Sequence, residues 1–299
     1  MKHIVQFSGG AGSWAASKRV AAKHGTADLV LLFCDTYIED DDLYRFLLEG
    51  AANVFGLSAP QIPALPWIDD IPARKAALDD LFDSARQLIP GLVRLADGRT
   101  PHEVYRDARF LGNSRVAHCS TELKQALADA YVAENFSPTN LVRYIGLDWS
   151  EGHRFFGNGK KQKGFKKRMA ELGWQSEAPL LAPPYLTKPD MLAEMKAEGL
   201  KPPRMYEEGF AHNNCGGRCC KAGITHWAHM LLTRPAYFAL SEGEENELRD
   251  MLGDVSMLSD RAGAGGKKPL PLTTLRKRIE AGAQIDMYEI GGCGCFTEE

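Results

Sequence analysis

A glycine-rich segment close to the N-terminus has the composition of an anion-binding loop. Ser8-Gly9-Gly10-Ala11-Gly12-Ser13 separates a short apolar run, residues 3–7, from an alanine-rich run, residues 14–23. Glycines let the backbone turn sharply, and a helix after them adds free N–H groups and the positive end of its dipole. The hydroxyls of the two serines are further donors. The segment is predicted to bind phosphate; the alternative is a plain turn between a strand and a helix.

The cysteines are the second group suited to chemistry. The sequence holds seven, of which Cys34 and Cys119 stand alone and five are clustered, as Cys215-Gly-Gly-Arg-Cys219-Cys220 and as Cys293-Gly-Cys295. In a reducing compartment such clusters indicate metal or redox chemistry more often than disulfides. Thiolates are soft ligands that select iron–sulfur clusters, zinc or copper(I), and a cubane cluster needs about four of them. The C-terminal pair could complete such a site or act as a mobile nucleophile.

Charged side chains near predicted strand ends are candidates for ligand contact. Asp35-Thr36 follows the apolar run 28–34, where a carboxylate can meet a ribose hydroxyl, an adenine amino group or a metal, or can cap a helix. Arg115 and Lys124 flank Cys119 and suit phosphate or sulfate oxygens. Arg154 is a further anion binder. The lysine-rich stretch 160–168 is either a solvated face or a clamp for phosphate, including that of a nucleic acid.

The elements expected to position these residues form an α/β fold. Residues 3–7, 14–23, 28–34, 43–55 and 60–65 alternate between strand and helix patterns, which favours a parallel sheet with right-handed crossovers. Residues 70–135 are predicted helical, 140–147 a further strand, and 157–168 a loop. Thr187 and Asp190 form a capping box before a helix that ends near residue 198. We expect a nucleotide-binding unit over residues 1–185 and a helical, cysteine-bearing region over 186–299.

Composition narrows the class of protein. The chain has 299 residues, 44% of them hydrophobic, enough for one large domain or a domain with an appendage. The net charge of −3 gives no overall basic field that would attract nucleic acid. No run approaches the roughly 20 apolar residues of a membrane span, and the apolar run at the N-terminus is too short for a signal peptide. A cytoplasmic protein without a membrane partner is expected.

The order and spacing of these motifs resemble the phosphoadenosine-phosphosulfate reductase-like branch of the N-type ATP pyrophosphatases, the adenine nucleotide alpha hydrolase-like proteins. The loop is similar to their SGGxDS pyrophosphate loop, with Gly12 in place of the aspartate. Asp35-Thr36 resembles their strand-terminal Asp-Thr, and residues 115–124 resemble their R…C-S/T-x-x-x-K segment. Residues 146–154 resemble G-x-R-x-x-E-S-x-x-R, with Leu147 in place of the first arginine. The similarity covers about residues 4–223.

The resemblance implies a Rossmann-like fold, its cofactors and their ligands. It assigns ATP or another adenine nucleotide, with Mg²⁺, to Ser8, Gly9, Gly10, Gly12, Ser13, Asp35, Thr36, Arg115 and Arg154. It assigns an iron–sulfur cluster of the 4Fe–4S type to Cys119, Cys215, Cys219 and Cys220, with the fourth ligand open because the spacing is C-x3-C-C. A zinc site, which His212 or His226 could join, is the alternative. Cys293, Cys295 and Lys124 are the predicted catalytic residues.

Three functions are compatible with these motifs. The first is an ATP-dependent sulfurtransferase, as in the related DNA phosphorothioation and tRNA thiolation proteins, which would deliver sulfur to a nucleic-acid or small-molecule acceptor. The second is an oxidoreductase, a sulfonucleotide reductase in which a C-terminal thiol attacks the sulfate sulfur. The third is a non-catalytic nucleotide- and metal-binding regulator, an alternative that the departures at Gly12 and Leu147 leave open, although the motifs favour the two enzymes over it. A redox or sulfur-donor protein is an expected partner of either enzyme.

Overall fold

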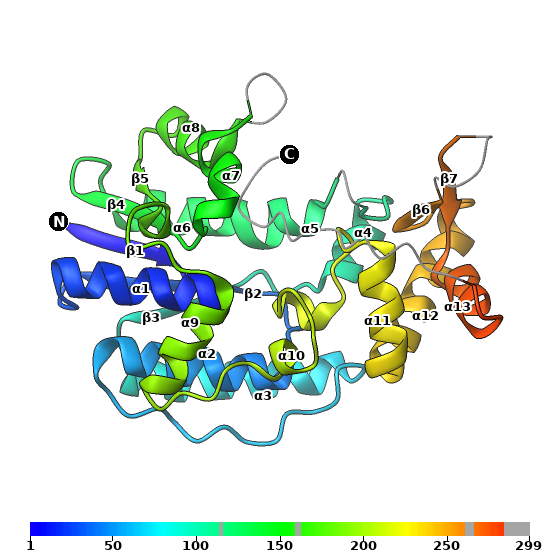
Figure 1. The fold of residues 1–299 in the computed structure, drawn as a ribbon, viewed down its shortest axis with the longest axis horizontal. Helices are drawn as coiled ribbons and strands as arrows, with labels where there is room; N and C mark the ends of the chain where they lie inside the picture. Colours follow the sequence, from blue (N-terminus) through cyan, green and yellow to red (C-terminus); the bar gives the residue numbers. More distant parts are fainter. Residues whose placement is uncertain (114–115, 159–162, 261–265, 284–299) are drawn as a thin grey trace.

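A five-stranded parallel sheet forms the centre of the N-terminal region (Figure 1). The computed structural model describes residues 1–113, 116–158, 163–260 and 266–283. Every strand pair in the sheet is parallel, in the spatial order β3-β2-β1-β4-β5. The strands are β1 (Lys2–Gln6), β2 (Leu29–Asp35), β3 (Leu92–Ala96), β4 (Leu141–Ile145) and β5 (Gln175–Glu177). The predicted α/β fold with a parallel sheet is confirmed and is consistent with a Rossmann-like arrangement.

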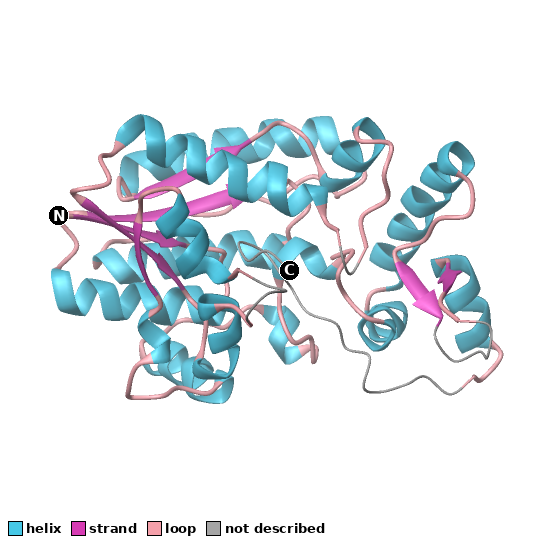
Figure 2. Ribbon diagram, turned by 90° about the horizontal axis from the view of Figure 1, so that it is seen from above, coloured by secondary structure: helices cyan, strands magenta, loops and turns pink. Residues whose placement is uncertain are grey.

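Helices cover both faces of this sheet (Figure 2). On one face, side chains such as Val5 and Phe33 pack against α1 (Ala11–His24), α2 (Asp41–Phe55), α3 (Ile71–Leu88) and α9 (Lys188–Ala197). On the other face, Ile4 and Leu32 pack against α6 (Leu127–Asn135), α7 (Gly152–Phe156) and α8 (Gly164–Glu171). Burial on both faces explains why β2 is a nearly continuous apolar run, and why four of the five residues of β1 and all five of β4 are buried.

The chain direction across the sheet changes between β1 and β4. From β1 the chain builds β2 and β3 to one side, and it then returns to place β4 and β5 on the other side. Ligands of open parallel sheets bind outside the carboxyl ends of the strands at such a point. Gln6 at the end of β1 pairs in register with Ile145 at the end of β4. The crevice expected for a ligand therefore lies just beyond these two residues.

The C-terminal residues surround a further apolar cluster that includes Trp227 and Phe238. Ile38, Ile68 and Tyr105 join it from the N-terminal region. The predicted boundary at residue 185 stays a prediction; α9, which follows it, packs against α1. The elements outside the central sheet and its covering helices are α4 (Pro101–Asp107), α5 (His118–Ser120), the π-helical η1 (Thr121–Ala126), η2 (Trp149–Glu151), η3 (Pro179–Leu181), α10 (Arg204–Glu207), η4 (Asn214–Gly217), α11 (Ile224–Thr233), α12 (Pro235–Leu252), β6 (Leu258–Asp260), β7 (Lys268–Leu270) and α13 (Leu272–Glu280).

Three local predictions differ from the structure. The strand predicted at residues 60–65 is wrong: the segment is a loop, because Pro60 and Pro63 have no N–H to donate to a ladder. The third strand is β3, which lies inside the stretch predicted to be helical. Residues 157–168 were expected to form a loop, yet α8 begins at Gly164. Among the described helices, none is both long enough and apolar enough to cross a membrane.

Candidate functional site

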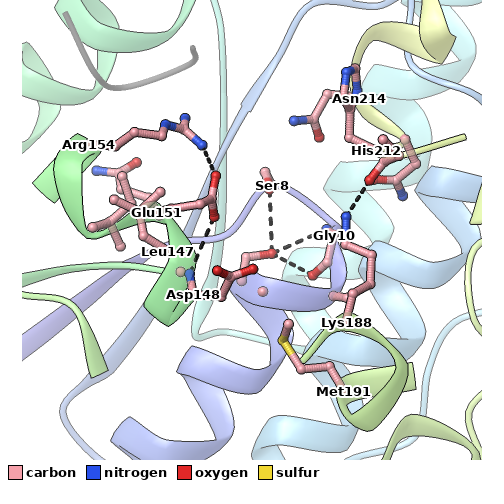
Figure 3. Close-up of a pocket in the computed structure, with 18 of the residues that line it drawn as sticks. Ser8, Gly10, Leu147, Asp148, Glu151, Arg154, Lys188, Met191, His212 and Asn214 are labelled. Carbon is pink, nitrogen blue, oxygen red and sulfur yellow. Dashed lines mark hydrogen bonds and ion pairs between the residues drawn. The ribbon is translucent and has the colours of Figure 1, made fainter. Parts of the chain in front are cut away.

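A cavity of about 370 Å³ opens at the carboxyl ends of β1 and β4 (Figure 3). The loop of residues 8–13 forms one wall, and residues 145–154 form the facing wall. Lys188, Tyr206 and residues 211–214 close a third side. Segments from three distant parts of the chain therefore meet at the point where the sheet order reverses, and the volume is in the range of small-molecule sites.

Backbone geometry and serine hydroxyls shape the glycine loop. Gly9 has a φ of +73°, a left-handed conformation that favours glycine. The Ser13 hydroxyl donates to the Gly10 carbonyl at 2.9 Å and accepts from the Gly10 N–H at 3.2 Å. Ser8 Oγ lies 3.5 Å from Ser13 Oγ, so both hydroxyls are on the same side of the turn. The first N–H groups of α1 have no partners within the helix, as at any helix start. The wall has the polarity of an anion site.

Gly12 is required by a close contact between the first turn of α1 and the end of β4. A Cβ atom at Gly12 would lie 2.6 Å from the Gly146 carbonyl oxygen, and one at Gly146 would lie 2.5 Å from the Gly12 carbonyl oxygen. Both distances are far below an ordinary van der Waals contact. In this structure, therefore, an aspartate at position 12 has no room, which gives a physical reason for the departure from SGGxDS.

The facing wall carries charges of both signs. Asp148 accepts from the Ser150 N–H at 2.8 Å and so caps η2. Arg154, a predicted anion binder, lines the cavity and forms an ion pair with Glu151 one turn earlier (Figure 3). An arriving anion would compete with Glu151 for this guanidinium. The wall thus offers a cation that is already paired and a carboxylate, Asp148, that is held in place.

Lys188 is a cavity residue that the sequence reasoning missed. It is the first residue of α9, and its ammonium donates to the Ala211 carbonyl and lies 5.2 Å from the centroid of the Tyr206 ring. Burial lowers its pKa, and the nearby carboxylates of Glu151 and Asp148 act in the opposite direction. The only local signal was the capping box that starts α9, which indicates a helix and not a site. Figure 3 shows this side chain beside the glycine loop.

A C-terminal segment is tied directly to the glycine loop. Asn213 Nδ2 donates to the Gly9 carbonyl at 3.0 Å, and the Tyr206 hydroxyl accepts from the Ala11 N–H at 3.2 Å. Asn213 is almost completely buried, and Asn214 lines the cavity beside it. Cys215 follows in the chain, so the cysteine segment is anchored to the loop by the residues before it.

Four of the predicted metal ligands come together in space. Cys119, Cys215, Cys219 and Cys220 line one small cavity, together with Tyr105 and Lys124. The chain turns sharply here, because Cys215, Gly216 and Gly217 have consecutive positive φ angles of 55°, 57° and 82°. The Cys119 thiol lies 2.9 Å from the Tyr105 hydroxyl. In number and kind the thiols suit a cluster; within the described part of the chain, however, no three Cys, His, Asp or Glu side chains form a ready-made metal-binding group.

The acidity of these thiols depends on their mutual contacts. Hydrogen bonds from Cys119 and Cys219 lower the pKa of Cys220 well below its usual value, with a smaller contribution from the Lys221 ammonium. The same contact with Cys220, together with burial, raises the pKa of Cys119. A thiol whose pKa is lowered by neighbouring thiols gives up its proton to a soft metal more readily.

Glu39 links the thiol cavity to the end of β2 and was also missed from the sequence. Its carboxylate accepts from the Cys215 N–H and from the Thr36 hydroxyl, and it lies 3.5 Å from the Lys124 ammonium. Lys124 Nζ is also 3.7 Å from the Cys215 sulfur. Thr36 and Lys124, predicted for the nucleotide and for catalysis, thus line the thiol cavity. Their predicted roles stay predictions.

The remaining predicted residues occupy other places. Asp35 is fully buried, and its carboxylate accepts from Tyr44 at 2.7 Å and from Arg94 at 2.8 Å, away from the residues that line the larger cavity. Cys34 is part of β2, and burial of its side chain in the apolar cluster with Ile4 and Leu32 raises its pKa to about 12. Three predicted site residues lie outside the described residues: Arg115, Cys293 and Cys295.

The two histidines considered for a zinc site pack beside the sharp turn of residues 215–217. His226 Nε2 is 2.6 Å from the Gly217 carbonyl oxygen, and its ring stacks on His212 at 5.3 Å. Burial lowers the pKa of His226 to about 4, so the ring is neutral at pH 7 and acts as a donor to the turn.

Of the lysine-rich stretch 160–168, Arg168 is buried in an ion pair with Asp129 at 2.6 Å.

No known protein family matches this sequence, and no curated protein matches it.

Proposed function

We propose that the chain is an adenine-nucleotide-dependent sulfurtransferase. ATP binds in the larger cavity with its phosphates against residues 8–13, and a thiolate-held centre forms at Cys119, Cys215, Cys219 and Cys220. One observation carries the proposal: Asn213 bonds to the Gly9 carbonyl of the loop, two residues before Cys215. A nucleotide site and a thiol cavity that share one short segment suit a reaction in which activation and sulfur delivery occur in one protein.

The proposed chemistry has two balanced steps. An oxygen atom of the acceptor attacks the α-phosphorus of ATP; the new O–P bond forms, the bond to the bridging oxygen breaks, and pyrophosphate leaves. Hydrosulfide, the second substrate, then attacks the acceptor carbon; a C–S bond forms, the C–O bond breaks, AMP leaves with the electron pair, and the proton passes to solvent. Sulfur stays at the sulfide oxidation level, so no external electrons are needed.

The residues of the cavity have defined tasks in this proposal. The N–H groups that follow Ala11 in the first turn of α1 hold the phosphates together with the Ser8 hydroxyl and with the Ser13 hydroxyl, which gives up its bond to the Gly10 carbonyl. These donors stabilise the negative charge that develops on pyrophosphate. Lys188 adds a partly desolvated positive charge at the same wall. Arg154 exchanges its Glu151 partner for a phosphate oxygen. A 4Fe–4S cluster held by three of these four thiols would leave one iron open, and that iron would supply a site where sulfide is bound before delivery.

Nucleotide binding is tested by calorimetry with ATP and with its non-cleavable α,β-methylene analogue. The double variant Ser8→Ala/Ser13→Ala is expected to bind both at least about tenfold more weakly, because hydrogen bonds to charged groups are worth about 1.5–3 kcal/mol each. Ser84→Ala, an exposed serine on α3, is the matched control and should bind like the wild type. Unchanged affinity in the double variant would reject the nucleotide site at the glycine loop. Release of sulfite from a sulfonucleotide by the wild type would reject the sulfurtransferase in favour of a sulfonucleotide reductase.

The thiolate centre is tested by anaerobic purification followed by iron and acid-labile sulfide analysis. We expect about four of each per chain, as in a cubane cluster. Cys119→Ser should lose most of the iron, whereas Cys34→Ser should retain it, because Cys34 is buried in a different core cluster. A colourless protein that holds stoichiometric zinc and no iron would contradict the cluster and favour the zinc alternative.

A further inference from the structure

Gln6 is a buried polar side chain at the floor of the larger cavity. It is the last residue of β1, it is 3% exposed, and it lines the cavity together with Ile145 and Leu147. Within the described residues, neither its amide nitrogen nor its amide oxygen has a hydrogen-bond partner. Both halves of one carboxamide are therefore removed from bulk water without compensation.

Such a group is costly to the free protein. Side chains alternate along a strand, so Gln6 projects on the same face of the sheet as Ile4, which lies in an apolar cluster with Leu32 and Ile145. An unpaired buried donor or acceptor destabilises a fold by about 1–3 kcal/mol, and an apolar residue of similar shape would avoid this. Orphaned polar groups of this kind in a cavity indicate a ligand that completes them.

The chemistry of the carboxamide limits what that ligand group can be. Phosphate oxygens accept only and would leave the amide oxygen unpaired, whereas a metal ion would leave the amide nitrogen unpaired. The amidine edge of adenine offers an amino donor beside a ring-nitrogen acceptor, which matches both amide atoms, as glutamine does when it reads adenine in nucleic acids. The neighbours Ile145 and Leu147 are apolar and suit the faces or edges of a flat ring better than a charged phosphate.

We propose that Gln6 recognises the base of the nucleotide, through the amino group and an adjacent ring nitrogen of adenine. This assignment rests on the proposed function, and it assigns separate parts of the cavity to the phosphates and to the base of the nucleotide. The loop of residues 8–13 contacts the phosphates, and the floor beside β4 holds the base. Gln6 is in this view a specificity-determining residue that reduces the stability of the free protein and strengthens ligand binding.

The test compares Gln6→Met with the wild type in two measurements. For the ligand-free proteins, Gln6→Met should raise the Tm by about 2–4 °C, because it removes unpaired amide atoms. In calorimetry Gln6→Met should bind ATP about 10- to 100-fold more weakly than the wild type, because it loses both hydrogen bonds to the base. It should bind tripolyphosphate, which has no base, as the wild type does. Gln87→Met, an exposed position on α3, is the control and should change neither ATP affinity nor tripolyphosphate affinity.

Analogues of ATP identify which part of the nucleotide is read. The wild type should bind purine riboside triphosphate, which lacks the amino group, several-fold more weakly than ATP, and Gln6→Met should bind the two equally. Gln6→Leu provides a second variant if the methionine variant does not fold. If Gln6→Met weakens binding of the desamino analogue as much as binding of ATP, and leaves binding of 2′-deoxy-ATP unchanged, the ribose hydroxyl is the partner of Gln6 and the assignment is overturned.

Two further results separate the failure of this inference from that of the proposed function. If the wild type binds ATP while Gln6→Met has unchanged affinity and a lower Tm, the amide is a water-bonded structural group and only this inference fails. If the wild type binds neither ATP nor tripolyphosphate, the proposed function fails and the assignment of Gln6 fails with it.

Discussion

The contact between Gly12 and Gly146 makes a sharp prediction about the glycine loop. Gly12 is the second residue of α1, and it packs directly on the backbone at the end of β4. Gly12→Ala adds one methyl group at the place where the loop, the helix and the sheet meet. Gly12→Asp restores the residue expected from the SGGxDS pattern and adds the same Cβ atom.

The magnitude follows from the distances. The new Cβ atom would lie 2.6 Å from the Gly146 carbonyl oxygen, whereas ordinary contacts are 3.4–4 Å, so the backbones must separate by about 0.8 Å. Overpacking of this kind costs about 1–3 kcal/mol, and replacing a helical glycine by alanine returns about 0.5–1 kcal/mol. We expect Gly12→Ala to lower the free energy of unfolding by about 1–2 kcal/mol. Gly12→Asp should lose at least as much, and neither variant should bind ATP more tightly.

Urea unfolding followed by circular dichroism measures this difference. Gly243→Ala is the matched control, because Gly243 lies inside α12 and a Cβ atom there meets nothing within 4 Å. The control should gain about 0.5–1 kcal/mol from its lower chain entropy when unfolded. If Gly12→Ala is as stable as the wild type, or is stabilised like the control, the close approach of α1 to β4 is absent and the shape of the cavity must be revised.

Two further predictions concern buried charges and protonation. Burial lowers the pKa of His226 to about 4 from 6.5, so between these pH values the unfolded chain binds a proton that the folded chain does not. The free energy of unfolding should therefore fall by up to about 3 kcal/mol as the pH decreases through this window. Urea unfolding at pH 7 and at pH 5 should show a smaller loss for His226→Gln than for the wild type. Asp40 is 1% exposed and pairs with Arg204 and Arg234. Asp40→Ala should cost about 3–5 kcal/mol in the same assay, whereas Asp83→Ala, which removes an exposed pair with Arg86, should cost less than about 1 kcal/mol; equal losses would refute a buried network.

Local features of the fold could be predicted from the sequence. The strand before the glycine loop, the helix after it and the apolar run that became β2 depend on neighbouring residues and were found close to their predicted bounds. The capping box at Thr187 formed as expected, with Thr187 Oγ1 accepting from the Asp190 N–H. The strand predicted at residues 60–65 is absent because its prolines cannot donate to a ladder. β3 was not predicted because a short apolar run such as Leu92–Ala96 resembles a buried helical segment.

The grouping of residues around each cavity depended on the tertiary structure. Residue types at positions 8–13 and 215–220 indicated the kinds of chemistry, because glycine, serine and thiol groups have intrinsic capabilities. The packing of β1 beside β4 placed Arg154 near the loop, and the packing of α9 against α1 placed Lys188 there. The folded chain likewise brought Thr36 and Lys124 to the thiols. Sequence patterns report interactions within a few residues, whereas these contacts join segments up to about 200 positions apart. Their partners are selected by sheet order and core packing, which no local pattern contains.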